Sequence, residues 1–201
     1  PFFSPNDIDL IQESKYQIMD RHMEKNGDMG KWMMRCTASI QVNIDALNKK
    51  NMEEIAFIAD CLHPVASYLF SNSPFKNKKP VKNNFRNHIW LNTDKKRCNS
   101  LFDHGIHSPK NLLDNYINYF LNVPGIFELN KEGEAFETDN NFGEILTKLN
   151  HRGLLDEHYI LTFLRQIFTN VRLKRIVEIR GAGLLLGIKK KKNNVMISNL
   201  L

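Results

Sequence analysis

One stretch near the start of the chain constrains its fold more than any other. From residue 33 to residue 45, apolar and polar side chains alternate, and side chains on a β-strand point alternately to opposite faces of the sheet. The apolar positions are Cys36, Ala38, Ile40, Val42 and Ile44, and the polar positions are Arg35, Thr37, Ser39, Gln41, Asn43 and Asp45. The alternation predicts a strand with one face towards a core and one polar face.

The polar face of this strand carries no Lys or Glu side chain. Long charged side chains are usual on a solvated face, whereas a row of short hydroxyl and amide groups suggests a surface that contacts a ligand. An ordinary amphipathic strand of an antiparallel sheet shows the same alternation. The stretch alone therefore leaves both interpretations open.

A second strand is predicted from Val171 to Arg180. Alternate positions place three cations and one carboxylate on the same face, and these residues are Arg172, Lys174, Glu178 and Arg180. Burying unpaired charges costs a large amount of free energy. This face therefore needs anions or a metal ion, unless its charges form a salt-bridge ladder at the surface.

Apolar residues at helical spacing predict five helices. They cover residues 5–23, 52–70 and 142–149, one begins at Ser108-Pro109, and one is capped by Asp156. Residues 52–70 give the clearest pattern, with an apolar stripe typical of a helix that packs on a core. The stripe consists of Ile55, Ile58, Ala59, Leu62, Val65, Ala66 and Leu69. Pro64 is expected to kink or divide this helix, and His63 beside it is interpreted as structural.

Length and composition exclude several classes of protein. The 201 residues fit one domain or a large part of one. The sequence has no apolar run of 18 residues, and its first residues lack the features of a signal peptide. Three widely spaced cysteines without a Cys-x-x-Cys motif argue against a zinc site or a disulfide framework. A reducing compartment, with a cytoplasmic location, is therefore expected.

The positive net charge is concentrated near the end of the chain. Lys189–Lys192 contribute +4 to the formal net charge of +6, and residues 193–201 carry no charge, which leaves +2 for residues 1–188. A basic tail on a nearly neutral body is weak evidence for nucleic-acid binding. A nucleic-acid-binding module is therefore the least favoured class.

The two predicted strands carry the side-chain types that a nucleotide-dependent ligation needs. Cations and divalent metal ions neutralise a phosphoryl group in transfer, carboxylate and amide oxygens hold such metal ions, and an arginine binds a substrate carboxylate through two hydrogen bonds. Between the strands, Trp90 stands among charged residues, where an indole ring can line a pocket or stack on a cation. Walker A, Gly-x-Gly-x-x-Gly and His-Glu-x-x-His motifs are absent from the sequence.

An ordered series of short motifs covers roughly residues 10–182. The motifs are Tyr16-Gln-Ile-Met19, Asp28-Met-Gly30, Met33-Met-Arg35, Gln41-Val-Asn-Ile-Asp45, Leu69-Phe-Ser-Asn-Ser-Pro-Phe75, His88-Ile-Trp90, Thr93-Asp94, Arg97, Val123-Pro124, Ile167-Phe168, Val171-Arg-Leu-Lys-Arg175 and Glu178-Ile-Arg-Gly-Ala182. In order and in approximate spacing, the series resembles the plant and proteobacterial type of glutamate–cysteine ligase. The resemblance rests on the ordered set, since no single motif is decisive.

This resemblance implies an α+β protein with a partial glutamine-synthetase-like fold, in which helices back an antiparallel sheet and the concave face of the sheet holds the active site. It implies that ATP phosphorylates the γ-carboxylate of L-glutamate and that the amine of L-cysteine attacks the resulting γ-glutamyl phosphate. The product is γ-glutamylcysteine, and the reaction is the first step of glutathione biosynthesis. ATP and Mg²⁺ are the cofactors that the resemblance implies.

Nine positions match functional residues of the family. The expected cations at the phosphates are Arg180, Arg172 and Lys174. The expected substrate-binding residues are Trp90, Arg97, Asn43 and Arg35. The expected metal ligands are Glu178 and Gln41. In this assignment Arg180 stabilises the transferring phosphoryl group, and Arg97 binds the carboxylate of glutamate.

The sequence departs from the family pattern at both ends. The family has an earlier strand with a Glu-x-Glu pair that holds Mg²⁺, and no such strand precedes Pro1. After Ala182 the family continues with Asp-Gly-Gly-Pro, whereas residues 184–201 form an atypical Leu/Lys/Asn tail. We therefore expect residues 1–183 to be part of a catalytic domain, either as a fragment of the enzyme or as one chain of a split enzyme in which a second chain supplies the missing strand.

Two alternative functions stay open. A related ATP-dependent γ-glutamyl ligase would use another amine acceptor. A non-catalytic remnant or subunit would bind glutamate or a partner chain without turnover, and the absent Glu-x-Glu pair favours it for this chain alone. No nucleic-acid or membrane partner is expected.

Overall fold

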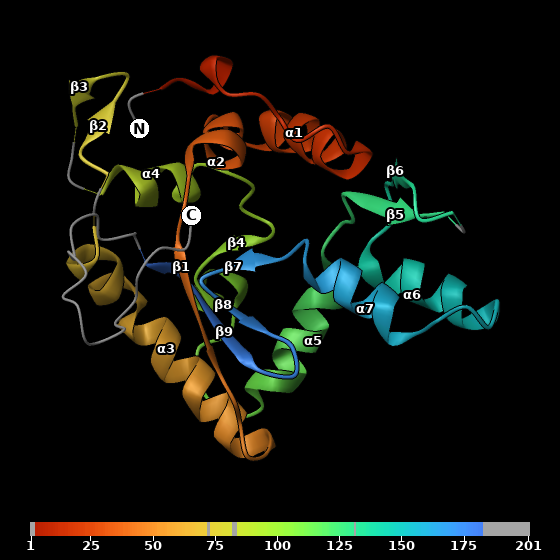
Figure 1. Cartoon of the computed structure of the whole chain (residues 1–201). Helices are drawn as coiled ribbons and strands as arrows, with labels where there is room; N and C mark the ends of the chain where they lie inside the picture. Colours follow the sequence, from red (N-terminus) through yellow and green to blue (C-terminus); the bar gives the residue numbers. More distant parts are fainter. Residues whose placement is uncertain (1–2, 72, 82–83, 131, 183–201) are drawn as a thin grey trace, which may run out of the picture.

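The computed structural model describes residues 3–71, 73–81, 84–130 and 132–182 (Figure 1). Helices and short strands, most of them in antiparallel pairs, follow one another along the chain, which confirms the predicted α+β class. The helices are α1 (Ser14–Asn26), α2 (Gly30–Cys36), α3 (Lys49–Leu69), α4 (Phe85–Leu91), α5 (Leu112–Asn122), α6 (Phe142–His151) and α7 (Glu157–Leu164), with the 3-10 helices η1 (Pro5–Asp7) and η2 (Leu101–His104). The strands are β1 (Ile40–Ile44), β2 (Phe75–Lys76), β3 (Lys79–Pro80), β4 (Cys98–Asn99), β5 (Phe127–Leu129), β6 (Ala135–Glu137), β7 (Phe168–Thr169), β8 (Val171–Leu173) and β9 (Val177–Ala182).

Two further sequence expectations concern the end of the chain and membrane-spanning helices. The proposed tail over residues 184–201 lies outside the described residues. None of the helices in the described ranges combines the length and the apolar character that crossing a membrane requires.

The central sheet has the strand order β1-β9-β8, and both pairs are antiparallel. Its strands run through the middle of the molecule in Figure 1. The single strand predicted over residues 171–180 is a hairpin of β8 and β9. Asn43, Glu178 and Arg172 are paired directly across the three strands, so their side chains share one face of the sheet.

The opposite face of the sheet is part of the larger hydrophobic core. Val171, Leu173 and Val177 are buried there and pack with residues of α3, α5, α6 and α7. A second core cluster joins α1, α2 and α4 to β5, and its buried members are Ile18, Met23, Met33, Phe85, Ile89, Ile126 and Phe127. The sheet therefore has one apolar face that is covered by helices and one polar face.

The prediction of a strand over residues 33–45 is wrong for its first half. Residues 30–36 form α2, and β1 begins only at Ile40. Met33 is buried in the second core cluster, and the hydroxyl of Thr37 donates a hydrogen bond to the main-chain oxygen of Met33 where the helix ends. Val42 was expected to face the core, but it is 47% exposed.

Helix α3 faces the core with a side that carries both polar and apolar residues, and the predicted apolar stripe is only partly correct: Ala59 is buried and Ile55 packs against the core, but four other members of the stripe are exposed. Its buried residues are Glu53, Ala56, Ala59, Asp60, His63 and Ser67, whereas Ile58, Leu62, Val65 and Leu69 are 56–66% exposed. Glu53 Oε1 accepts a hydrogen bond from the main-chain N–H of Leu113, in the first turn of α5, at 3.1 Å. Asp60 Oδ2 accepts hydrogen bonds from Ser100 Oγ at 2.6 Å and from the N–H of Leu101, at the start of η2, at 2.8 Å.

These hydrogen bonds explain the orientation of α3. The first N–H groups of a helix have no partner within the helix, and a carboxylate is a strong acceptor for them. Two carboxylates of α3 serve this purpose for α5 and η2, so the side of the helix that carries them faces inwards. The helix runs without a break through Pro64, and the division expected there is absent from the described structure.

A bulge in β9 brings this strand close to α3. The register shifts after Ile40, so that Arg180 and Gly181 together lie opposite one residue of β1. Gly181 has a φ angle of +94°, and a Cβ atom at this position would lie 2.3 Å from Nε2 of His63 in α3. The close approach of the two elements therefore depends on glycine.

Replacing Gly181 with Ala is expected to lower the free energy of unfolding by about 2–4 kcal/mol, because the variant combines a positive φ with a contact to a buried ring. His63 is 5% exposed and cannot swing away. Gly105→Ala is the matched control, since Gly105 has a φ of +79° with open space around its Cβ position, and its cost is expected to be about 1 kcal/mol. Urea unfolding followed by circular dichroism measures both, and an equal loss would contradict the close contact.

Candidate functional site

A buried carboxylate surrounded by three cations forms the centre of the candidate site. Glu178 lies on β9 and is 2% exposed. Its Oε1 accepts hydrogen bonds from Arg172 Nη2 at 2.7 Å and from Arg180 Nη1 at 2.6 Å. Its Oε2 lies 2.5 Å from Lys174 Nζ. The structure thus brings together the four charged residues predicted to share one face.

This cluster contains two more positive charges than negative charges. Burial alone would raise the pKa of Glu178, but contacts with the three cations outweigh burial and lower the pKa to about 2. Arg172 also donates to main-chain oxygens at the end of α7, where the helix dipole favours a cation. The ion-pair ladder expected as one alternative is present, but it is buried, and its excess positive charge favours an anion.

Aromatic rings lie beside the cation cluster. The guanidinium of Arg180 lies 5.7 Å from the centre of the Phe168 ring, within the range of a cation–π contact. The guanidinium of Arg86 lies 5.3 Å from the centre of the Trp90 ring. Both residues of the second pair belong to α4 and are one helical turn apart. The Trp90 and Phe168 rings are 6.1 Å apart, which places Trp90 close to the cluster.

A small cleft of about 20 Å³ lies among these side chains, between α3, α4 and β9. It is large enough for one water-sized group. Nε2 of His63 and Nε1 of Trp90 line it and have no hydrogen-bond partner among the described residues. Burial and the neighbouring Arg180 lower the pKa of Arg86 to about 10. Two guanidinium groups beside an unpartnered indole N–H suit an oxyanion.

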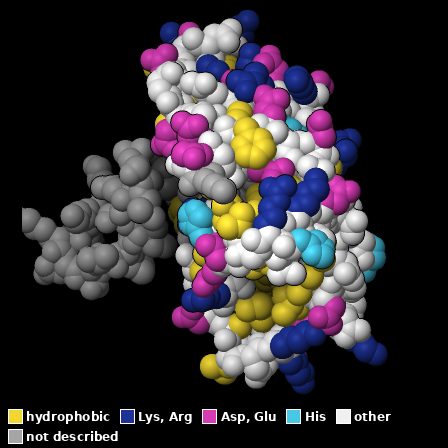
Figure 2. Space-filling model, turned by 90° about the vertical axis from the view of Figure 1, so that its right-hand side faces the viewer, with side chains coloured by type: hydrophobic (Ala, Val, Ile, Leu, Met, Phe, Trp, Pro, Cys, Tyr) yellow, Lys and Arg dark blue, Asp and Glu magenta, His cyan; other side chains and the backbone are white. Residues whose placement is uncertain are grey.

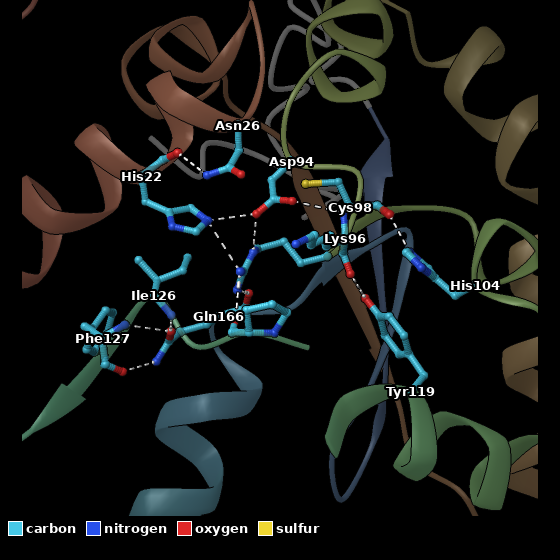
Figure 3. A network of polar contacts seen from close by, with 12 residues as sticks. His22, Asn26, Asp94, Lys96, Cys98, His104, Tyr119, Ile126, Phe127 and Gln166 are labelled. Carbon is cyan, nitrogen blue, oxygen red and sulfur yellow. Dashed lines mark hydrogen bonds and ion pairs between the residues drawn. The ribbon is translucent and has the colours of Figure 1, made fainter. Parts of the chain in front are cut away.

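Arg97 does not line this cleft and belongs to a buried network, of which His22, Asp94 and Gln166 are labelled in Figure 3. Its guanidinium is fully buried and donates to Asp94 Oδ2 at 2.6 Å, to Pro124 O at 2.7 Å and to Gln166 O at 3.3 Å. His22 Nε2 lies 2.9 Å from the same Asp94 oxygen. Burial alone would raise the pKa of Asp94, but hydrogen bonds and the Arg97 charge hold it well below its usual range.

The surroundings of Arg97 do not support the substrate contact predicted for it. A carboxylate in solution has no access to a guanidinium that is 0% exposed, and the donors of this group already point at protein oxygens. Gln166 extends the network, since its Oε1 accepts a hydrogen bond from Ile126 N at 2.8 Å and its Nε2 donates to Phe127 O at 3.0 Å. Arg97 therefore connects segments of the fold.

Three other predicted residues lie in the N-terminal part of the chain. Arg35 belongs to α2, and its guanidinium binds the carboxylate of Asp20 through hydrogen bonds of 2.6 and 3.1 Å. Gln41 and Asn43 lie on β1 and are exposed. Asn43 pairs directly with Glu178, whereas Gln41 lies opposite the bulge. The structure thus places Asn43 next to the cation cluster and engages Arg35 elsewhere.

The described residues do not fit a divalent metal ion at Glu178. Both oxygens of this carboxylate already face cations, and a metal ion would add further positive charge to a site with an excess of it. In the described part of the chain, no three His, Cys, Asp or Glu side chains converge so that they could hold a metal ion. The metal roles predicted for Glu178 and Gln41 are therefore not supported by this geometry.

Two larger hollows lie outside the cleft. One has a volume of about 580 Å³ and is lined by His104, Tyr119 and several asparagines of α5. The other has a volume of about 390 Å³ and an apolar lining from α5 and α7. Figure 2 shows the side of the molecule that carries α5, α6 and α7, where apolar side chains gather in the lower half. Of the predicted site residues, only Lys174 lines either hollow.

Of the titratable residues that line the cleft, the sequence interpretation missed Arg86 and His63. Arg86 precedes Trp90 by four residues, which is the spacing of one helical turn. That signal carries weight only if residues 85–91 are helical, and the sequence did not predict a helix there. His63 was interpreted as structural, because the bulge that brings β9 against it leaves no sign in residue spacing.

Comparisons with known proteins agree with the sequence resemblance. Residues 1–193 match the model of the glutamate-cysteine ligase family 2 (GCS2). The chain is 33% identical over 196 residues to the chloroplastic glutamate–cysteine ligase of Medicago truncatula and 34% identical over 196 residues to that of Arabidopsis thaliana. A chloroplastic glutamate–cysteine ligase A of Oryza sativa subsp. indica is 33% identical over 193 residues.

The chain belongs to glutamate–cysteine ligase family 2, since the family model covers most of its length. Each of the three matches covers 90% of this chain but only 35–37% of the relative. The chain thus spans just over a third of the length of the curated relatives that it matches.

Replacing Arg97 with Ala is expected to lower the free energy of unfolding by about 3–5 kcal/mol, because Asp94 would be left buried without its cation. Arg175→Ala is the matched control. Arg175 pairs with Glu157 at 2.6 Å, but its side chain is 80% exposed, and such pairs contribute about 1 kcal/mol or less. Guanidinium unfolding of both variants measures the difference. A small loss for Arg97→Ala would argue against a structural role for the network.

Acid is expected to remove the stabilisation that the cation cluster gives to folding. Because folding lowers the pKa of Glu178 from 4.5 to about 2, this contribution is complete above pH 4.5 and is lost as the pH falls towards 2. The test is the free energy of unfolding across this range for the wild type and for Glu178→Gln. The variant should lose less stability over the range than the wild type does, and parallel curves would contradict the lowered pKa.

Proposed function

We propose that this chain forms part of a ligase that joins the γ-carboxylate of L-glutamate to the amine of L-cysteine, coupled to cleavage of ATP. The product is γ-glutamylcysteine, and the reaction is the first step of glutathione biosynthesis. The observation that carries the proposal is the buried group of three cations around Glu178, next to Arg86 and Trp90, in a chain of the glutamate–cysteine ligase family.

The cations act on the phosphoryl group in the first step. An oxygen of the γ-carboxylate attacks the γ-phosphorus of ATP, and the new O–P bond forms as the bond to ADP breaks. Arg180 and Lys174 retain side-chain exposures of 12% and 22%, so they are the cations that a phosphate can reach. They stabilise the charge on the transferring group without reorganising, because Glu178 already holds them in place.

Arg172 has a different part in this step. Its side chain is 7% exposed, and it donates to both oxygens of Glu178. It therefore orients the carboxylate that positions Arg180 and Lys174. In the second step the cysteine amine attacks the acyl carbon of γ-glutamyl phosphate and loses a proton, and inorganic phosphate leaves.

In this proposal the cleft between α3, α4 and β9 is the substrate-binding surface next to the cations. Arg86 lines this cleft with Arg180 and the indole N–H of Trp90, and its Nε and Nη1 already donate to Ala38 O and Gly181 O. The room left for one water-sized group suits a single oxygen of a carboxylate, such as the α-carboxylate of glutamate. Asn43 lies beside Glu178 on the exposed outer strand, where its amide reaches a ligand on the polar face. In this proposal Arg35 and Arg97 stabilise the surrounding fold and do not contact substrate.

We place the sheet in a partial glutamine-synthetase-like fold, supported by its antiparallel strands with one polar and one helix-covered face. Mg²⁺ would enter with ATP and neutralise phosphate charge, and no step is assigned to it through these residues. Among the described strands β1 pairs only with β9, so its outer edge can accept a strand from a second chain. A reducing compartment suits the free cysteines, either the cytoplasm or the chloroplast that the names of the relatives give.

A non-catalytic remnant or subunit is the second candidate. Two observations favour this candidate. Both oxygens of Glu178 are paired with cations, and no group of three His, Cys, Asp or Glu side chains in the described part of the chain could hold a metal ion. Such a chain would retain the anion-binding cleft and bind glutamate or phosphate without turnover.

The proposal is tested by measuring ADP release and γ-glutamylcysteine formation with glutamate, cysteine, ATP and Mg²⁺. The chain is assayed alone and together with the product of any reading frame found upstream of its gene. In the active preparation, Arg180→Gln is expected to lower kcat by at least about 100-fold, the scale of losing one group that stabilises transition-state charge. Arg175→Gln, on the exposed end of the hairpin, should leave kcat unchanged.

Two results would overturn this assignment. An active preparation in which Arg180→Gln matches the wild type would remove Arg180 from the chemistry. The absence of turnover in both preparations, with ATP still bound by the wild type and lost in Arg180→Gln, would leave the remnant as the function.

A further inference from the structure

Among the described arginines that are not exposed, Arg86 differs from the others because no carboxylate is paired with it. The others form ion pairs, Arg35 with Asp20, Arg97 with Asp94, and Arg172 and Arg180 with Glu178. Arg86 takes part in none of the ion pairs that the described residues form. A cation that is held away from water without a counter-charge is costly, so this position favours an anion.

The remaining residues of the sequence offer no carboxylate side chain to Arg86 either. Residues 1–2, 72, 82–83, 131 and 183–201 lie outside the described ranges, and none of them is Asp or Glu. The guanidinium of Arg86 donates to main-chain oxygens, from Nε to Ala38 O and from Nη1 to Gly181 O, both at 2.9 Å. Its Nη2 makes no hydrogen bond with the described residues. A donor of this cation is therefore left for a ligand.

Arg86 lines the cleft between α3, α4 and β9 together with Arg180, and no carboxylate is among the described residues that line it. Nε1 of Trp90 and Nε2 of His63 are buried there without a hydrogen-bond partner among the described residues. Buried polar atoms without a partner are rare in folded proteins, and a bound water molecule or ion is a common explanation. The cleft therefore has the properties of a binding site for one or the other.

Charge decides between a water molecule and an ion. The cation cluster around Glu178 already carries two more positive than negative charges, and Arg86 adds another. Burial and the charge of Arg180 lower the pKa of Arg86 to about 10, which leaves this side chain charged at neutral pH. A water molecule would not compensate the excess charge, whereas an anion between Arg86 and Arg180 offsets part of it.

The size of the cleft decides which anion fits. Its volume is about 20 Å³, which is room for one water-sized group. A polyatomic anion such as sulfate or phosphate can enter only with one of its oxygens. A halide ion is a single atom not much larger than a water molecule, and it accepts hydrogen bonds from any direction. The cleft therefore suits a halide ion as a whole.

We propose that this cleft is a binding site for one halide ion of the size of chloride. Arg86 and Arg180 supply the positive charge, and the indole N–H of Trp90 donates a hydrogen bond to the ion. Burial lowers the pKa of His63, so its ring is neutral at neutral pH, and the bound ion selects the tautomer with its hydrogen on Nε2. The site needs no substrate, so it does not rest on the proposed ligase function.

The test is the linewidth of the chloride signal in chlorine NMR, measured with the full chain in the absence of glutamate and ATP. The signal broadens when chloride exchanges with a site on a protein. The wild type is expected to broaden it in a saturable way, and bromide should reverse the broadening by displacing chloride. Sulfate fits only with one oxygen, so at equal ionic strength it should displace chloride less well than bromide does.

Two tryptophan variants locate the site. Trp90→Phe keeps a ring beside Arg86 but removes the N–H, so it should weaken chloride binding at least about tenfold, the scale of a hydrogen bond to a charged group. Trp32→Phe is the matched control, because Trp32 packs against Phe85 in the second core cluster and does not line the cleft. It should bind chloride as the wild type does.

Three outcomes would overturn the proposal. The first is a wild type that broadens the signal no more than Trp90→Phe does, which would leave a water molecule in the cleft. The second is an equal loss of binding in Trp32→Phe. The third is displacement by sulfate at lower concentrations than by bromide, which would place the chloride on an open cationic surface.

Fluorescence keeps the proposal testable if Trp90→Phe fails to fold. The chain has two tryptophans, so Trp90 is the only one left in Trp32→Phe. Bromide bound beside the indole quenches its emission through the heavy-atom effect, and this quenching should saturate and be relieved by chloride. Quenching that rises in proportion to bromide and does not respond to chloride would contradict the site.

One consequence does rest on the proposed function. The halide would occupy the place proposed for one carboxylate oxygen of glutamate, so in an active preparation chloride should raise KM for glutamate and leave kcat unchanged. Gluconate at the same ionic strength is the control salt. An unchanged KM together with saturable chloride binding would remove glutamate from the cleft and keep the anion site, so the two failures are distinguishable.

Discussion

The buried guanidinium of Arg97 is the interaction on which the arrangement of the other segments depends. It contacts residues that follow α4, α5 and α7, and it adjoins His22 in α1 (Figure 3). The main-chain oxygen of Arg97 also accepts a hydrogen bond from Phe168 N at 2.7 Å, next to the parallel pair of β4 and β7. Because Arg180 lies over the Phe168 ring, the network also fixes one wall of the cation cluster. Arg97 thus helps to position the cation cluster through a main-chain hydrogen bond to Phe168.

Residue patterns predict the structure best where it depends on residues that are close together in the sequence. The alternation of Arg172, Lys174, Glu178 and Arg180 foretells a shared charged face, and the structure has it. The hairpin between β8 and β9 was missed because its turn, Lys174 to Ile176, contains no Gly, Pro, Asn or Asp. The short helix α2 was missed because it depends on Gly30, whose missing Cβ lets the chain lie against the main chain of Met23.

Features that depend on distant partners could not be read from spacing. The apolar stripe of α3 is real, but acceptor groups for η2 and α5 set which side of the helix faces inwards, and these partners lie 40 to 60 residues away in sequence. The candidate site also depends on residues that are distant in sequence. A motif locates Arg97, but only the folded chain shows that its guanidinium is sealed from solvent, and that Arg86 lines the same cleft as Trp90.

The burial of Cys98 in β4, beside the Arg97 network, has a consequence for redox chemistry. Burial raises the pKa of this thiol to about 12, and the thiolate is the form that reacts with oxidants and disulfides. Cys98 therefore stays a thiol when the surroundings become oxidising, whereas Cys61 meets solvent on α3. Oxidative stress would thus act on the outer surface of a helix and leave the inner frame of the fold chemically unchanged.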